Sequence, residues 1–179
     1  MKKIGKAFMI MLLAYNVSAQ TNSNFTEAEL KNIRQEVNAQ AKVFQQQLLS
    51  PAEDTLRNRF TVDTFKIEYT LRLKMDKNPS THGMLEAMND ANTAYDKMLN
   101  HYYQLLLKKM KSGDKVYLIN AQKAWIQFRD EDEKLLSTLH GDAYTGGGTM
   151  YQLSYYSALL QRVQQRAIEV FLYYENINI

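Results

Sequence analysis

The chain has 179 residues, 22 Lys and Arg against 19 Asp and Glu, no cysteine and 45% apolar residues, a composition typical of one globular domain. The net charge of +3 is carried by Lys2, Lys3 and Lys6, because the rest of the chain holds equal numbers of each sign. This balance argues against a nucleic-acid-binding protein, which needs a surplus of Lys and Arg. The lack of cysteine excludes disulfides, thiolate nucleophiles, iron–sulfur clusters and cysteine zinc sites.

Residues 1–19 are typical of a secretory signal peptide. A cationic start precedes an apolar run from Ala7 to Val17, and the small-residue site Val17-Ser18-Ala19 follows. The alternative is a retained membrane anchor, but a spanning helix needs about 20 apolar residues and this run is shorter. We therefore expect cleavage near Ala19 and an exported protein, periplasmic or extracellular, without a membrane anchor.

The next segment predicts an amphipathic helix. Thr26 and Glu29 have the spacing of a capping box, in which each side chain binds a free backbone N–H of the first turn. Apolar residues then recur every three or four positions, which places them on one face: Leu30, Ile33, Val37, Ala41, Phe44 and Leu48. Ser50-Pro51-Ala52-Glu53 is a second helix-start signal, so we expect the first helix to end near Leu49.

Residues 60–76 carry two periodicities. Apolar residues at every second position, the spacing of a half-buried strand, are Phe65, Ile67, Tyr69, Leu71, Leu73 and Met75. Helical spacing instead selects Phe60, Thr64, Ile67, Leu71 and Met75. No second alternating run is present to pair with such a strand, so we interpret the segment as a helix and keep the strand as the alternative.

Three further helices are predicted. The first, from about Ser80 to Met110, carries a seam with alternating steps of four and three residues: Met84, Met88, Ala91, Tyr95, Met98, Tyr102 and Leu106. The second runs from about Asp114 to Leu139, where Gly141 is expected to supply a left-handed stop. A loop over Tyr144–Thr149 leads to the last helix, from about Met150 to Tyr174.

These elements predict an all-α fold, a helical bundle of about five helices with long antiparallel hairpins and no disulfides. After the signal peptide we expect an N-terminal helical extension over residues 20–62 and a helical domain over residues 63–179. The extension is expected to form a hairpin, followed by a three-helix core.

Catalytic and cofactor motifs are missing from the sequence. The three histidines lack the i, i+4 spacing of metal ligands on one helix face, and no nucleophile elbow, phosphate loop or nucleotide fingerprint is present. Gly146-Gly147-Gly148 is compatible with an anion cradle, but a flexible connection between two helices is the favoured interpretation. We expect no enzyme activity, no cofactor and no metal site.

The segment from Ala121 to Glu133 is the most distinctive. Trp125 and Arg129 are four residues apart, so the guanidinium is expected to stack on the only indole and to reach Glu133 one turn further. The favoured role of this ladder is structural, with Trp125 in the core. The four consecutive acids of residues 130–133 form either a solvated stretch or an acidic patch for a cationic partner.

Three strings carry a family resemblance: Ala94-Tyr95-Asp96-Lys97-x-Leu99, Gln122-x-x-Trp125-Ile126-x-Phe128-Arg129-Asp130 and Gln165-Arg166-x-x-Glu169. With the glycine-rich loop between the last two, they resemble the lysozyme inhibitor LprI-like family, over roughly Asp63 to Glu175. The resemblance implies an exported all-helical domain whose naming members inhibit lysozyme. It marks as structural motif residues Gln122, Trp125, Phe128, Arg129 and Arg166.

Two hypotheses follow. The first is a protein that blocks lysozyme by entering its cleft; the second is a cell-envelope interaction or scaffolding domain with another protein partner. Both use the tyrosines of the second half of the chain, which suit an interface. The candidate partner-binding residues are Arg129, Asp130, Glu131, Asp132, Tyr144, Gly146, Gly147 and Gly148.

Overall fold

The computed structural model describes residues 24–48 and 56–177. The predicted signal peptide and the start signal at Ser50–Glu53 lie outside these residues. The described parts form helices joined by turns and contain no strand. The helices are α1 (Glu27–Leu48), α2 (Leu56–Lys77), α3 (Thr81–Lys109), α4 (Lys115–Leu139), the single turn α5 (Asp142–Thr145) and α6 (Thr149–Asn176). The predicted all-α bundle of five long helices is confirmed.

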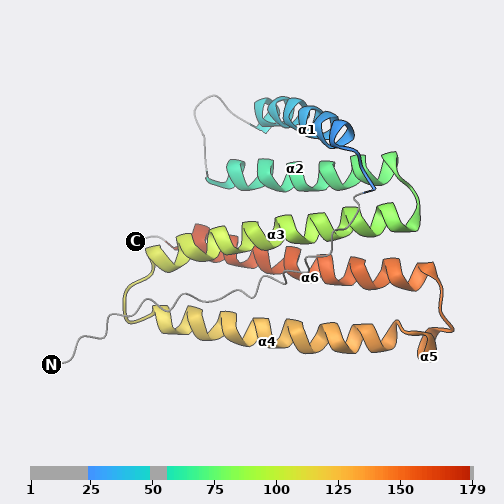
Figure 1. Cartoon of the computed structure of the whole chain (residues 1–179). Coiled ribbons are helices and arrows are strands. Elements are labelled where there is room, and N and C mark those ends of the chain that lie inside the picture. The colour runs from blue at the N-terminus through green and yellow to red at the C-terminus, as the bar shows by residue number, and fades with distance from the viewer. Residues whose placement is uncertain (1–23, 49–55, 178–179) are drawn as a thin grey trace.

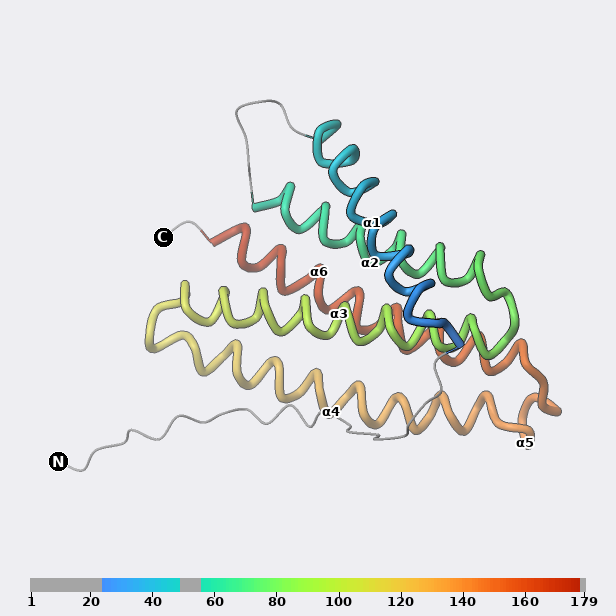
Figure 2. Tube along the Cα trace, turned by 45° about the horizontal axis from the view of Figure 1, so that its top comes forward, coloured from blue at the N-terminus to red at the C-terminus, as the bar shows by residue number. Residues whose placement is uncertain are grey.

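The long helices lie side by side with α3 and α6 at the centre (Figure 1). Helices α2 and α4 run in one direction on either side of this pair, and α3 and α6 both run in the other. Consecutive long helices therefore form antiparallel hairpins, as expected. Helix α1 crosses the outer face of α2 at an angle (Figure 2).

The main core lies between α3 and α6. Five of the seven predicted seam residues of α3 are buried, from Ala91 to Leu106, and the two methionines that precede them are half-buried. Helix α6 contributes Ala167, Val170 and Phe171, and the Tyr102 ring of α3 packs edge-on against Phe171 with 5.2 Å between centroids. The heptad-like spacing of α3 therefore predicted the centre of the core.

Helix α2 runs without interruption through residues 60–76, so the helical interpretation is confirmed. Its mixed periodicity has a physical cause, because α2 packs on both sides. Phe60, Ile67 and Leu71 contact the main core, whereas Tyr69 and Leu73 contact α1. The ring of Phe60 stacks on Phe171 with 3.9 Å between centroids.

A smaller core joins α1 to α2, formed by Phe25, Ile33 and Val37 with Leu30, Tyr69 and Leu73 around them. The predicted capping box begins α1: the Thr26 N–H donates to Glu29 Oε2 at 2.8 Å, and the Glu29 N–H donates to Thr26 Oγ1 at 3.3 Å. The Thr26 hydroxyl also donates to Glu29 Oε2, at 2.9 Å, and these two bonds from Thr26 to the carboxylate lower the pKa of Glu29.

Two predictions about the end of α4 are wrong. Gly141 is extended, with φ −74°, and is not a left-handed stop; α4 ends at Leu139 and is capped by His140, whose N–H donates to the Leu136 carbonyl. The expected loop at Tyr144–Thr149 is partly helical, because Tyr144 and Thr145 belong to α5 and Thr149 begins α6. The left-handed residues are Gly146, Gly147 and Gly148, with φ of 73°, 82° and 120°.

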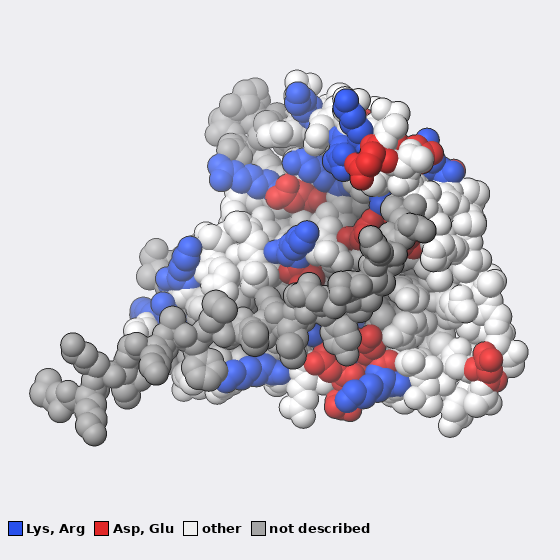
Figure 3. All heavy atoms as spheres, viewed as in Figure 1, with Lys and Arg blue, Asp and Glu red and all other residues white. Residues whose placement is uncertain are grey.

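Charged side chains are unevenly distributed on the surface. Figure 3 shows them mixed over α1, α2 and the middle of α4, whereas the end that carries α5 and the first turns of α6 is almost uncharged. In the sequence, the 27 residues from Leu135 to Gln161 contain Asp142 as their only Asp, Glu, Lys or Arg. This end of the bundle is therefore distinct in chemistry from the rest.

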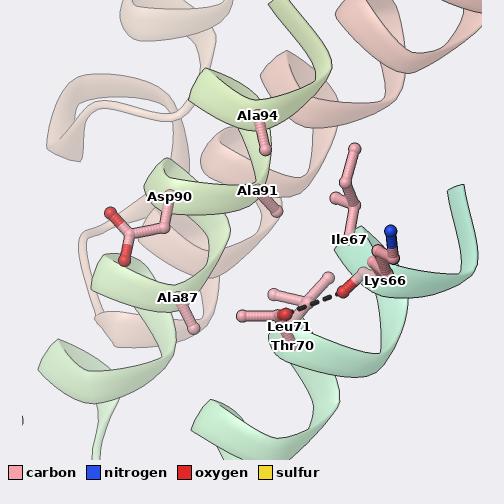
Figure 4. A pocket seen from close by; sticks show the side chains of 8 residues that line it. All are labelled: Lys66, Ile67, Thr70, Leu71, Ala87, Asp90, Ala91 and Ala94. Carbon is pink, nitrogen blue, oxygen red and sulfur yellow. Dashed lines mark hydrogen bonds between the residues drawn. The ribbon is translucent and has the colours of Figure 1, made fainter. Parts of the chain in front are cut away.

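A small pocket of about 170 Å³ lies between α2 and α3 (Figure 4). Its α2 side is formed by Lys66, Ile67, Thr70 and Leu71, and its α3 side by Ala87, Asp90, Ala91 and Ala94. The lining is mainly apolar, and the three alanines leave the space unfilled. We interpret the pocket as a packing gap between the α1–α2 hairpin and the core.

We expect Ala94→Leu to raise the free energy of unfolding by about 1 kcal/mol, because the added methyl groups fill this gap. The matched control is Ala167→Leu, at a fully buried position between α3 and α6. This substitution should lower the free energy of unfolding by about 1 to 3 kcal/mol through overpacking. Urea denaturation of the two variants measures both effects. A loss of stability in Ala94→Leu equal to that of the control would contradict the interpretation.

Candidate functional site

Helix α4 buries few residues, and polar contacts join it to the bundle beside Leu118 and Trp125. Among its 25 residues only Leu118 and Gln122 are buried, whereas α3 buries nine residues and α6 six. The buried Arg166 of α6 donates from Nε and Nη2 to Gln122 Oε1, both at 3.1 Å. The same guanidinium donates to Glu169 at 3.0 Å. A buried cation needs such acceptors, so Arg166 and Gln122 fix the position of α4.

Trp125 lies between two arginines. The Arg129 guanidinium is 5.4 Å from the indole centroid, and that of Arg166 is 5.8 Å away. Trp125 is half-buried and packs against the main core. The stacking of Arg129 on Trp125 therefore agrees with the i, i+4 prediction. The two cations hold the indole in one orientation.

The far end of the predicted ladder differs from the expectation. Arg129 pairs with Asp130 at 2.8 Å and lies 3.9 Å from Asp96 of α3, whereas Glu133 accepts a hydrogen bond from the Tyr155 hydroxyl at 3.4 Å. Burial raises the pKa of Asp96, and the nearby Arg129 opposes this shift. Burial and Glu133 raise the pKa of Tyr155 to about 12. The Tyr155 hydroxyl therefore stays protonated and donates.

The acidic run is largely paired within the chain. Besides Asp130, Glu131 pairs with Lys134 at 2.8 Å, and the shielded Asp132 pairs with Arg162 of α6. Arg162 also approaches the ring of Phe128, at 5.8 Å from its centroid. Sequence reasoning did not select Arg162, although it lies one turn before Arg166 on α6. Asp130 to Asp132 are therefore partners of neighbouring cations, with little negative charge left over.

The remaining candidates, Tyr144, Gly146, Gly147 and Gly148, lie at the nearly uncharged end of the bundle. Together with the exposed Met150 and Tyr151 that follow them, we call them the α5 tip. Tyr144 and Met150 are 69% and 73% exposed. The three left-handed glycines turn the chain sharply from α5 into α6. A side chain on Gly147 would contact the Asp142 carboxylate, with Oδ1 only 2.9 Å from the position of a Cβ, so this acid lies against the loop. Met150 was not selected from the sequence. The feature of the sequence that could have identified it is the nearly uncharged stretch in which it lies.

The structure thus divides the candidate residues into two groups. Arg129, Asp130, Glu131 and Asp132 lie near the middle of α4, whereas the tip follows the helix end, after Leu139. At 1.5 Å per residue, Asp132 lies about 10 Å before that end. Gln122, Trp125, Arg129 and Arg166 form one connected arrangement, and Phe128 lies beside it, exposed and near Arg162.

Within the described residues, no cluster of three or more His, Asp or Glu side chains has the arrangement of a metal site. The helices of that part were also searched for membrane-spanning candidates, and none has the necessary length and apolarity. We call Gln122, Trp125, Arg129 and Arg166 the α4 junction. Its polar groups are bound to one another or to neighbouring side chains, and the α5 tip offers rings, hydroxyls and backbone groups. This arrangement is suited to contact with another molecule.

Comparison with known proteins gives one match. The family model described as "Lysozyme inhibitor LprI" matches residues 74–170, which is more than half of the chain. The matched segment begins in the last turn of α2 and ends in α6, so it includes the α4 junction and the α5 tip. No curated protein and no solved structure matches the chain.

The Gln122–Arg166 contact generates a double-mutant prediction. We expect Gln122→Met and Arg166→Met each to lower the free energy of unfolding by about 2 to 3 kcal/mol, because each leaves the other side chain buried without its partner. The double variant should lose clearly less than the sum of the two, since no unpaired group remains. Urea denaturation measures all three. Strictly additive losses would show that the contact is not a coupled pair.

Asp96 generates a pH prediction. Its pKa is higher in the folded chain than in the unfolded chain, so ionisation at neutral pH opposes folding. We expect Asp96→Asn to be more stable than the natural chain at pH 7, and this advantage to shrink as the pH falls through the raised pKa, where the natural Asp96 is also neutral. Thermal unfolding from pH 3 to pH 7 measures the difference. An advantage that grows towards low pH would contradict the assigned direction.

Proposed function

Because the chain belongs to the LprI family of lysozyme inhibitors, we propose that it is an exported, non-enzymatic protein that inhibits lysozyme by placing the α5 tip in the enzyme's cleft. The family match makes it a lysozyme-inhibitor-like domain. The observation that supports the contact surface is the exposed, uncharged tip inside the matched segment. Residues 1–19 support export, since they have the pattern of a signal peptide.

The chemistry of the tip suits a polysaccharide-cleaving cleft. Such clefts carry a pair of carboxylates beside the scissile bond, and ligand clefts in general are lined by apolar and aromatic side chains with a few polar groups. Tyr144 offers a ring and a hydroxyl, Met150 an apolar chain, and the glycines a narrow backbone. Asp142 is the one acid nearby, and its carboxylate is turned against Gly147. The tip therefore brings little negative charge towards the catalytic carboxylates.

The acidic run makes a smaller contribution in this proposal. Arg129, Lys134 and Arg162 already pair with Asp130, Glu131 and Asp132. Acids that are already paired within the chain gain little from binding a further cation, although the charges at the surface steer an approaching charged partner. We therefore place the specific contacts at the tip.

We expect the purified chain beginning at Gln20 to inhibit the lysis of cell walls by lysozyme at micromolar concentration. Tyr144→Ala and Met150→Ala should each raise the inhibition constant about tenfold, the usual loss at a binding hot spot of about 1.4 kcal/mol. The matched control is Tyr173→Ala, a 51% exposed tyrosine near the opposite end of α6, which should inhibit like the natural chain.

Turbidity loss of a cell-wall suspension measures the inhibition, and circular dichroism checks that each variant is folded. If the natural chain leaves lysozyme activity unchanged, the proposed activity is wrong. The scaffolding hypothesis, with another protein partner, then becomes the better explanation of the tip. If Tyr144→Ala and Met150→Ala inhibit as well as Tyr173→Ala, the inhibitor binds by another surface.

A further inference from the structure

A second exposed apolar surface runs along one flank of α4. It consists of residues that recur at helical spacing, and we call it the α4 seam: Tyr117, Ala121, Ala124, Phe128, Leu135 and Leu139. All six are exposed; Tyr117, Phe128 and Leu135 are 71%, 56% and 53% exposed. The seam is separate from the face that carries Leu118, Gln122 and Trp125 towards the bundle.

The seam is long and nearly continuous. From Tyr117 to Leu139 it extends over about 33 Å of helix at 1.5 Å per residue. The one acid on this flank, Glu131, pairs with Lys134 of the same helix. Arg162 approaches the Phe128 ring from one side and leaves the ring more than half exposed. An apolar strip of this length on a helix surface marks an interaction site.

The two ends of α4 have opposite charge. Residues 115–123 contain two lysines and no acid, and three more lysines and Asp114 lie just before the helix, whereas residues 130–142, from α4 into α5, contain five acids and one lysine. When Arg129 and Arg162 are counted with the second group, it remains negative. Figure 3 shows the same polarity along the lower edge of the molecule, with Lys and Arg towards one end of α4 and Asp and Glu gathered towards the other half.

We propose that the α4 seam is the interface between two copies of this chain, packed antiparallel about a two-fold axis at Phe128. An antiparallel pair places the positive end of each α4 beside the negative end of the other, so the surface is complementary to itself. A two-fold interface requires this property, because the same patch must serve both copies. A parallel pair would bring like charges together at both ends.

The spacing of the seam agrees with this arrangement. Phe128 is the midpoint between Tyr117 and Leu139, so the two phenylalanines meet at the axis. Ala121 of each copy then lies opposite Leu135 of the other, which places a small side chain against a large one. Tyr117 lies opposite Leu139 at each end. The α5 tip lies beyond the end of the seam, so the inference stands apart from the proposed function.

The lack of cysteine in the natural chain makes the axis directly testable. A single Phe128→Cys substitution should form a disulfide-linked dimer under mild oxidation at tens of micromolar protein, because two copies of residue 128 meet there. Tyr117→Cys alone should form no disulfide cross-link, because the two copies of residue 117 lie at opposite ends of the seam, whereas a mixture of Tyr117→Cys and Leu139→Cys chains should cross-link. Tyr173→Cys, equally accessible but on α6, is the matched control.

Non-reducing electrophoresis measures the cross-linked fraction. Phe128→Cys that cross-links no more than Tyr173→Cys would overturn the proposal, as would Tyr117→Cys alone cross-linking more than its mixture with Leu139→Cys. Light scattering of the natural, cysteine-free chain should give the mass of a dimer, and that of Phe128→Glu the mass of a monomer. Circular dichroism should show that Phe128→Glu keeps the helical content of the natural chain.

Salt dependence tests the direction of the pair. If opposite ends meet, raising the salt concentration from 50 to 500 mM should weaken dimerisation several-fold, because the charges are screened. Analytical ultracentrifugation of the natural chain measures the dissociation constant. Tighter dimerisation at high salt would indicate that like charges meet and would overturn the antiparallel order.

Discussion

The close packing of α3 against α6 is the constraint on which the rest of the structure depends. A chain without cysteine has no disulfide to stabilise it and depends strongly on buried apolar area, and most of the buried apolar residues in the described part belong to these two helices. The largest fully buried side chains are Tyr95, Leu106, Val170 and Phe171, and all four belong to these two helices. The other long helices pack onto this pair.

The contrast between α3 and α4 explains how the protein carries exposed apolar surface and stays folded. Helix α3 is enclosed by α2 and α6, so its apolar seam is buried. Helix α4 is held by Arg166, Gln122 and the arginine stack on Trp125, and these contacts use only one narrow face. The remaining apolar residues of α4 are left on the surface. Polar attachment of a helix thus frees its flank and its end for intermolecular contacts.

Much of the fold could be predicted from the sequence because periodicity reports burial on one face. It succeeded for α1 and α3, each of which has one buried stripe. It was ambiguous for residues 60–76, because α2 is buried on two sides and its apolar residues sample both patterns. It gave no sign of α5, a single turn without a buried residue, and the positive φ angles expected at Gly141 occur after that turn, at Gly146–Gly148.

The candidate site was less predictable, since its contacts join residues far apart in the sequence. Helical spacing gave the stacking of Arg129 on Trp125, four residues away, but could not give the pairing of Asp132 with Arg162 or of Gln122 with Arg166. The sequence therefore identified an acidic run and overlooked that α6 supplies one of its counter-ions. Contacts within one helix follow from the spacing of its residues, whereas contacts between helices depend on which helices become neighbours in the fold.

The stacked rings of Phe60 and Phe171 have a consequence for defining the smallest folding unit. The family segment begins at Lys74, yet Phe60 lies 14 residues earlier and covers the fully buried Phe171. The segment ends at Val170, so a fragment trimmed to it would lack both rings, remove most of α2 and expose Tyr102, which packs against them. The family segment is therefore shorter than the part of the chain that forms the complete hydrophobic core, and recombinant fragments meant to fold should begin upstream of Leu56.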